Sequence, residues 1–391
     1  MNRTKLILVT ILFAVVAESR GQRQAVNNDF IKVDVTKTNY PKKELILQDF
    51  MDVEYIPLET NNDFLNQGVV MDIGKEFILV KNRNQDGDIF VYDRTGKALR
   101  KINRKGQGGE EYILIVSITL DEDNKEMFIN DALSHKILVY DLYGKFKRKI
   151  NTNKKEKVLT YYKEIFNYDK DNLICYDNAS SSKIPFVLIS KQDGSITKEI
   201  EIPFEERKSL SAPTNKEVGL VAVPTPFYSI IPNNENLPLS EISSDIVYTF
   251  LPDYNLRPYI ERTPSVQSMN PEVCLIVRFI SNRYIFMETI KNDYDWNTRS
   301  GFPSTFMMYD RQEKAFGRYA VYNGDYSTKK EIYMSRMTPV SHEILSWYSY
   351  EAYQLVESYR KGELKDGKLK EIASKLDEED NPVIMLIKHK K

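Results

Sequence analysis

The sequence predicts an all-β protein, a β-propeller of six blades, and three observations lead to that prediction. A stretch of fourteen residues, 89–102, occurs again at 137–150 with nine identical positions and an offset of 48 residues. Each copy reads as an alternating strand, a turn that carries Gly, and a second strand. The chain is also rich in aromatic residues that pack well on sheets, with 25 Tyr and 18 Phe. Repeats of this length made of short strands are typical of propeller blades.

The chain begins with a stretch typical of a secretory signal peptide, residues 1–21. Arg3 and Lys5 give it a positive start, residues 6–17 form an apolar run, and small residues precede Gln22, where we expect cleavage. The apolar run is too short for a permanent transmembrane helix. No Cys follows it as a lipid attachment point, and no other stretch is long and apolar enough to cross a membrane. We therefore expect an exported protein, either periplasmic or extracellular.

Residues 22–44 read as an N-terminal lead-in, with one strand-like piece at 30–35. We place the propeller at 45–391. Its first strand alternates over 53–58 and contains Pro57. Because proline cannot donate a hydrogen bond to a neighbouring strand, we expect an edge or outer strand here.

The blades follow in order along the chain. Two complete blades are expected at about 66–102 and 113–150. Later blades are degenerate, but their third strands can be followed. Positions 92, 140, 190, 248 and 309 are taken as equivalent in the five blades. The step between them grows from 48 to 61 residues, which predicts longer loops in the second half.

The C-terminal part departs from this pattern. Residues 351–361 and 368–376 read as helices, so we expect a small helical insertion at about 351–377. An apolar strand follows at 383–387. Because a closed propeller must cover the edges of its last sheet, we expect 383–387 and 53–58 to share one blade. That brings the number of blades to six.

Composition argues against several classes of function. The 55 basic and 56 acidic residues are evenly mixed, so the chain has no electrostatic footprint of nucleic-acid binding. Cys175 and Cys274 each lie in an apolar run, as small buried residues do. An oxidising compartment would allow a disulfide between them, but two cysteines do not make a disulfide framework. We expect a monomer without a metal site or a cofactor.

The linker between the two clean repeats resembles a known family. Residues 103–112, NRKGQGGEEY, resemble the Gly-x-Gly-Pro-x-Glu-Tyr linker of six-bladed propellers found in exported Bacteroides-type proteins, which are related to NHL-repeat propellers. Gly109 stands where that family has Pro. Residues 56–59 and 380–382 also look like this family, and the similarity extends over about 45–391. The resemblance implies a six-bladed fold and export, and it brings no catalytic residues.

Two motifs partly match known ligand-binding loops. Residues 106–109 are Gly-rich, but the strand-like stretch 113–116 follows them, whereas a phosphate-binding loop leads into a helix. Residues 293–297 have the spacing of a calcium loop, but Thr298 and Ser304 replace the Gly and Glu that an EF-hand requires. A polar loop bearing a Trp remains, which suits a sugar or peptide ligand. No nucleophile-elbow motif occurs, so we assign no catalytic residues.

These observations predict a non-catalytic binding or scaffold protein that uses one face of the propeller to bind an unknown carbohydrate, peptide or protein partner. The loops from second to third strand and from outer strand to the next blade share that face. The candidate ligand-binding residues on it are Asn82, Arg83, Arg104, Gln107, Glu110, Tyr112, Asp131, His135, Asp177, Asn178, Asp295 and Trp296. The alternative is a calcium-dependent hydrolase of the propeller lactonase type, with Asn, Asp and Glu side chains around calcium in the channel. That alternative rests on fold analogy alone.

Overall fold

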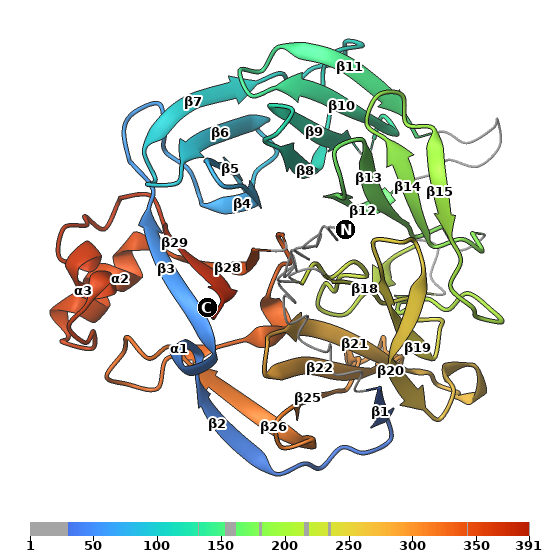
Figure 1. Ribbon diagram of the computed structural model, residues 1–391. Coiled ribbons are helices and arrows are strands. Elements are labelled where there is room, and N and C mark those ends of the chain that lie inside the picture. The colour runs from blue at the N-terminus through green and yellow to red at the C-terminus, as the bar shows by residue number, and fades with distance from the viewer. Residues whose placement is uncertain are drawn as a thin grey trace, which may run out of the picture.

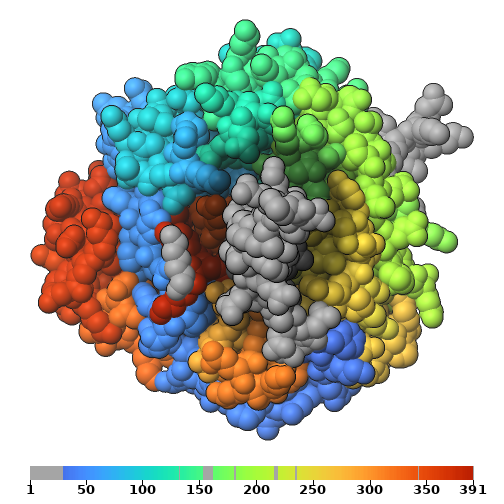
Figure 2. Space-filling view, in the orientation of Figure 1, coloured from blue at the N-terminus to red at the C-terminus, as the bar shows by residue number. Residues whose placement is uncertain are grey.

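The chain forms a ring of six sheets. The computed structural model describes residues 30–390 apart from 132, 153–161, 180–181, 215–218, 234–235 and 342. The signal peptide expected at 1–21 therefore lies outside the described residues. Figure 1 shows the sheets around a common centre, which confirms the predicted six-bladed propeller. In the space-filling view, colours change in chain order around the disc, with the C-terminal helices in red at its rim (Figure 2).

Blades 1 to 3 are four-stranded antiparallel sheets whose innermost strand comes first in the chain. Blade 1 consists of β4 (Val69–Ile73), β5 (Phe77–Lys81), β6 (Asp88–Asp93) and β7 (Ala98–Asn103). Blade 2 consists of β8 (Ile115–Asp121), β9 (Glu126–Asp131), β10 (Lys136–Asp141) and β11 (Phe146–Asn151). Blade 3 consists of β12 (Tyr162–Asn167), β13 (Asn172–Asp177), β14 (Phe186–Ser190) and β15 (Ile196–Ile200).

The three third strands share a bulge next to the fourth strand. It lies at Val91/Tyr92 in blade 1, at Val139/Tyr140 in blade 2 and at Leu188/Ile189 in blade 3. Ile189, rather than the expected Ser190, is therefore the equivalent of Tyr92. The sequence count was wrong by one because the turn that follows is one residue longer in blade 3.

Blades 4 and 5 are completed by the N-terminal segment. Blade 4 contains β18 (Leu237–Leu239), β19 (Ile246–Phe250) and β20 (Leu256–Thr263), and β1 (Ile31–Asp34) pairs with β20 in parallel. Residues 229–233 hold the innermost place, where Ile231 N donates to Pro238 O. Blade 5 contains β21 (Val273–Ile280), β22 (Tyr284–Lys291), β25 (Ser304–Asp310) and β26 (Ala315–Tyr322), and β2 (Lys42–Ile46) pairs with β26 in parallel.

The segment expected as a lead-in up to residue 44 is therefore part of the propeller. Its strand-like piece at 30–35 forms β1, and the expected boundary at residue 45 falls inside β2. Parallel pairing to the outermost strands of two distant blades has no local sequence signal, which is why the boundary was misplaced.

Blade 6 closes the ring with strands from both ends of the chain. It contains β28 (Ile344–Tyr350), β29 (Val383–His389) and β3 (Met51–Pro57). Val383 pairs with Pro57 and Ile387 with Val53, so the predicted sharing of one blade is confirmed. β3 is the outer strand, as Pro57 indicated. The short helix α1 (Leu47–Phe50) leads from β2 into β3.

The predicted helical insertion lies between β28 and β29. It contains α2 (Ala352–Arg360) and α3 (Lys368–Ala373). The buried faces of both helices pack against the core shared by blades 5 and 6, through Leu355 of α2 and Leu369 of α3. Four smaller strands form two hairpins outside the blades, β16 (Ala212–Pro213) with β17 (Val221–Ala222) and β23 (Tyr294–Asp295) with β24 (Ser300–Gly301). The remaining short elements are β27 (Glu331–Ile332) and the 3-10 helices Val266–Ser268 and Met334–Arg336.

The hydrophobic core is divided among the interfaces between blades. Six clusters of buried apolar side chains each join two neighbouring blades, including one that joins blade 6 to blade 1. Cys175 and Cys274 are both buried and form no disulfide with each other. Because each blade buries its two faces against its neighbours, the ring is stable only when it is closed.

One buried side chain, that of Asn381, stabilises the closure of the ring. Asn381 is fully buried and lies directly before β29. Its Oδ1 accepts from Asn66 N at 2.8 Å, and its Nδ2 donates to Glu59 O at 2.8 Å and to Phe64 O. It therefore ties β29 to the connection that leads into blade 1, which gives a physical role to the 380–382 motif.

Candidate functional site

The connections between strands define two faces of the disc. We call the upper face the one formed by the connections from second to third strand and from each outer strand to the next blade. It carries the long connections, including 201–228, 323–337 and the helical insertion. Most of the exposed large apolar side chains described in connections lie on it: Leu65, Ile113, Leu133, Leu220, Val221, Val223, Tyr333, Tyr353 and Tyr359. The upper face therefore offers most of the apolar contact area.

The twelve candidate residues all lie in connections of the upper face or at strand ends next to them. Several of them stabilise the fold. Tyr112 is 1% exposed, accepts from Arg104 N at 2.8 Å and donates to Gly87 O at 2.7 Å. Asp131 is fully buried and accepts from the backbone N–H groups of Ile113 and Leu114. Buried groups with satisfied hydrogen bonds have little left for a ligand.

Others are held by local contacts. Asn82 donates to Asp86 at 2.7 Å, Arg83 forms an ion pair with Glu351 at 2.9 Å, and Arg104 donates to Gly144 O. His135 has φ 48°, and its carbonyl accepts from the Thr152 hydroxyl at 2.8 Å. Gln107 and Glu110 are exposed on the linker.

The remaining four lie on blades 3 and 5. Asp177 is buried and accepts from Ala179 N, next to exposed Asn178. Asp295 accepts from Asn297 N, and Trp296 contacts Tyr294 edge-on with ring centroids 5.1 Å apart. None of the twelve candidates lines either of the two channel cavities, although Arg104 and Tyr112 are hydrogen-bonded to each other and Asn82 lies beside Tyr112.

The inner ends of the blades enclose two cavities along the axis of the ring. The upper cavity, about 280 Å³, is lined at its rim by Val69, Lys81, Val116, Lys163, Tyr228 and Thr338. Val69, Val116 and Lys163 lie at the upper ends of inner strands, Lys81 lies at the upper end of the second strand of blade 1, and Tyr228 and Thr338 lie in connections. The lower cavity, about 290 Å³, is lined by residues at the opposite strand ends, among them Lys75, Glu122, Asn167 and Glu343. Asp72, Phe166 and Val340 line both cavities, so the two cavities are adjacent within the channel.

The inner strands are joined to one another by side chains. Asp72 of β4 accepts from Leu120 N of β8 at 2.7 Å, and Thr119 of β8 donates to Ile165 O of β12 at 2.8 Å. Glu164 of β12 accepts from Ser229 N at 2.8 Å and from Ile230 N at 2.9 Å. These bonds run around the channel and give the two carboxyl groups a structural role.

The same two carboxyl groups have unusual acidities. Burial raises the pKa of Asp72 to about 7, against the effect of its backbone hydrogen bonds from Leu120 and Ile73. Burial also raises the pKa of Glu164 to about 7, although nearby Lys163 opposes the shift. Shifts of this kind are frequent at functional sites but also occur in structural networks.

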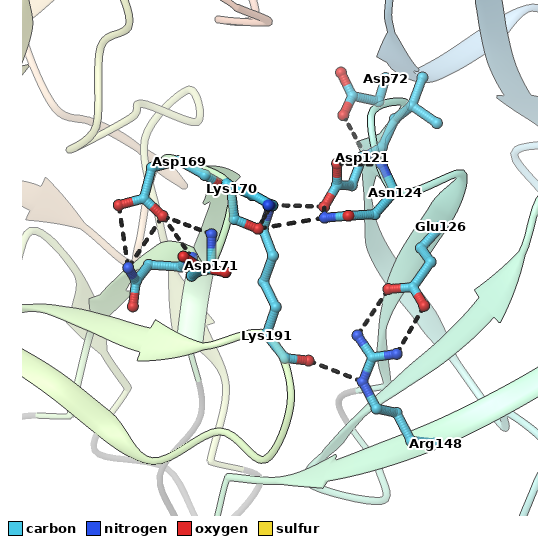
Figure 3. A network of polar contacts seen from close by, with 11 residues as sticks. Asp72, Asp121, Asn124, Glu126, Arg148, Asp169, Lys170, Asp171 and Lys191 are labelled. Carbon is cyan, nitrogen blue, oxygen red and sulfur yellow. Dashed lines mark hydrogen bonds and ion pairs between the residues drawn. The ribbon is translucent and has the colours of Figure 1, made fainter.

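A buried ion pair joins blades 2 and 3 on the lower side. Lys191 Nζ lies 2.6 Å from Asp121 Oδ2, and both side chains are almost fully buried. Lys191 also donates to Asp169 O, while Arg148 forms a two-pronged pair with Glu126 and donates to Lys191 O (Figure 3). Each of these four charged side chains, Asp121, Glu126, Arg148 and Lys191, pairs with one of opposite charge. The network therefore stabilises the contact between blades 2 and 3, and none of its four charges is free for a ligand.

The better candidates for a ligand site are residues that the sequence analysis missed. Lys81, Lys163, Tyr228 and Trp347 line the upper cavity. The signal that would have found them is their place in the repeat, since Lys81 ends the second strand of blade 1 and Lys163 lies near the start of an inner strand. Trp347 lies on β28, a strand that the sequence analysis did not identify.

The described residues hold no group of three or more His, Cys, Asp or Glu side chains that could bind a metal ion. Within the same residues, no helix is long and apolar enough to cross a membrane.

Fold and channel together define a six-bladed β-propeller with a two-part axial cavity. The chain belongs to the family described as a domain of unknown function, DUF4934, whose model matches residues 30–388. No curated protein matches its sequence.

Solved structures of several bacterial proteins are similar to this chain. A Bacteroides fragilis protein named as an exported protein is similar with a TM-score of 0.53 and 15% identity, over 90% of this chain and 99% of that one. A member of the DUF4221 family from Bacteroides vulgatus has a TM-score of 0.49 and 12% identity, over 87% and 98% of the two chains. Virginiamycin B lyase from Staphylococcus aureus, with a TM-score of 0.37 and 11% identity over 86% and 99%, is too distant for any argument. The similarity to the Bacteroides fragilis protein confirms the resemblance to exported Bacteroides-type propellers at the level of the fold.

Proposed function

We propose that the protein is exported and that it is a non-catalytic binding protein, which holds a small ligand in the upper cavity and presents it at the upper face. The observation that carries this proposal is the upper cavity itself. It combines aromatic side chains, Tyr228 and Trp347, with polar groups at one open end, which is the usual make-up of a ligand site.

Export is proposed from the signal-like residues 1–21 and from the similar protein named as exported. We further propose that the mature chain works in the periplasm or outside the cell. The ligand classes that fit a cavity of this size are a small sugar or a short peptide, since aromatic side chains pack against rings and apolar side chains.

The alternative of a calcium-dependent hydrolase is not supported by the channel residues. Calcium binds several free, ionised oxygen ligands. The oxygens of Asp72 and Glu164 instead accept backbone N–H groups of neighbouring strands, and burial raises the pKa of both carboxyl groups. Asp72 and Glu164 therefore do not fit a calcium site.

The test is ligand-detected NMR with a panel of monosaccharides, disaccharides and dipeptides. Thr338→Tyr would fill the mouth of the upper cavity, and the matched control Asn167→Tyr would place the same side chain in the lower cavity. Ligands should bind the wild-type protein and Asn167→Tyr, and should be lost from Thr338→Tyr. Binding that survives Thr338→Tyr, or a panel without a single ligand, would contradict the proposal.

A further inference from the structure

Two lysines at the mouth of the upper cavity lack an acidic partner. Lys81 Nζ reaches only Asn82 O, at 3.3 Å, and Lys163 Nζ reaches Phe227 O, also at 3.3 Å. Lys163 also lies over the Phe227 ring, 4.3 Å from its centroid. In the described part of the chain, no ion pair within 4.0 Å includes either lysine. An ammonium group has three donors, so each has hydrogen-bonding capacity left for a ligand.

The acidic groups of the cavity form no direct ion pair with these lysines in the described part of the chain. Asp72 and Glu164 are the carboxyl groups among its lining residues, and both accept hydrogen bonds from the backbone of neighbouring strands. Burial drives both toward the neutral form. Asp86 lies near Lys81 and favours its charged form, whereas burial lowers the pKa of Lys81. The Asp86 carboxylate accepts from Asn82 Nδ2 and from Asp88 N rather than from Lys81. The ammonium groups of Lys81 and Lys163 therefore keep donors free for an anionic ligand.

The walls between the lysines are apolar and aromatic. Tyr228 and Trp347 line the cavity together with Val116 and Val340. The arrangement suits a ligand with an anionic group at one end and a ring or an apolar body at the other, because the cations can bind the charge while the aromatic faces contact the body.

We propose that the ligand of the upper cavity carries a carboxylate, which Lys81 and Lys163 bind together, while Tyr228 and Trp347 contact its ring or apolar body. This inference rests on the proposed use of the upper cavity for binding. A uronic-acid sugar and the C-terminal end of a peptide both offer this chemistry.

The first test needs no ligand. In a Trp296→Phe background, Trp347 is the only tryptophan, and it lines the cavity. At low salt, iodide should quench its fluorescence about ten-fold more effectively than caesium, because fixed cations concentrate anions in a cleft. The preference should largely disappear in Lys81→Met/Lys163→Met. It should persist in Lys149→Met, which removes an exposed lysine on the outer strand β11. Equal quenching by the two ions in the Trp296→Phe protein would overturn the inference.

The second test separates the two sources of the carboxylate. Galacturonate is compared with galactose, and N-acetyl-phenylalanine with its amide, by isothermal titration. One acid should bind about ten-fold more tightly than its neutral counterpart, and the double Lys→Met variant should bind both members of that pair alike. Melting curves establish that the variants are folded.

The outcomes distinguish this inference from the proposed function. If neutral probes bind as tightly as the acids and Thr338→Tyr abolishes their binding, the cavity binds ligands but the assignment of a carboxylate is wrong. An iodide preference without binding of either acid would also overturn that assignment.

Discussion

Removal of residues 381–391 should destroy the fold, because this segment is the middle strand of the blade that closes the ring. β29 pairs with β28 on one side and with β3 on the other, so its loss exposes two strand edges. Val383, Ile384, Met385, Leu386 and Ile387 are all fully buried. At about 1.5–3 kcal/mol for each large buried apolar side chain, the loss is about 8–15 kcal/mol. That equals the net stability of a typical domain, about 5–15 kcal/mol.

The expected result is an insoluble protein or one without a cooperative unfolding transition, since exposed edges also promote aggregation. Circular dichroism melting and size-exclusion chromatography provide the assay. A graded version is Asn381→Ala, which keeps β29 but leaves Asn66 N and the carbonyls of Glu59 and Phe64 without this partner. Each buried group left unpaired costs about 1–3 kcal/mol.

Asn84→Ala, at an exposed position in the β5–β6 connection, is the matched control and should melt like the wild-type protein. A truncated protein that stays soluble and melts like the full chain would refute the reasoning about closure.

Four further predictions follow from particular residues. Gly96→Ala should lower the melting temperature strongly, because Gly96 has φ +86° and an added Cβ would lie 2.0 Å from Pro57 O, whereas Gly109→Ala, with open space around it, should melt normally. Burial raises the pKa of Glu164 from 4.5 to about 7, so the stability that this group contributes is present at low pH and is lost as the pH rises through that range. The melting temperature of Glu164→Gln should therefore fall less between about pH 5 and pH 8 than that of the wild-type protein. Parallel curves of melting temperature against pH would contradict this prediction. Purified protein should not hydrolyse lactones with or without calcium, and turnover that Asp72→Asn abolishes would speak against a binding protein. N-terminal sequencing of exported protein should begin near Gln22, and an intact start on cytoplasmic protein would contradict export.

The sequence by itself determined the architecture, because propeller blades are local. The stretch at 89–102 and its copy at 137–150 contain a strand, a turn and a strand within a few residues, so their alternation is readable without tertiary information. The closing strands were also predictable. A run of five apolar residues at 383–387 needs partners on both sides, and 53–58 was the other unpaired strand.

Only the tertiary structure decided which strands complete blades 4 and 5 and which residues form the candidate site. β1 and β2 are short, and their parallel partners β20 and β26 are more than 200 residues away in sequence. The candidate residues were predicted from their positions in loops. Tyr112 and Asp131 are instead buried, and they hold the backbone of those loops through hydrogen bonds. Lys81, Lys163, Tyr228 and Trp347 come from different blades, and only the ring brings them to one cavity. Spacing along the chain cannot reveal such a site, because it depends on how six sheets meet at a common axis.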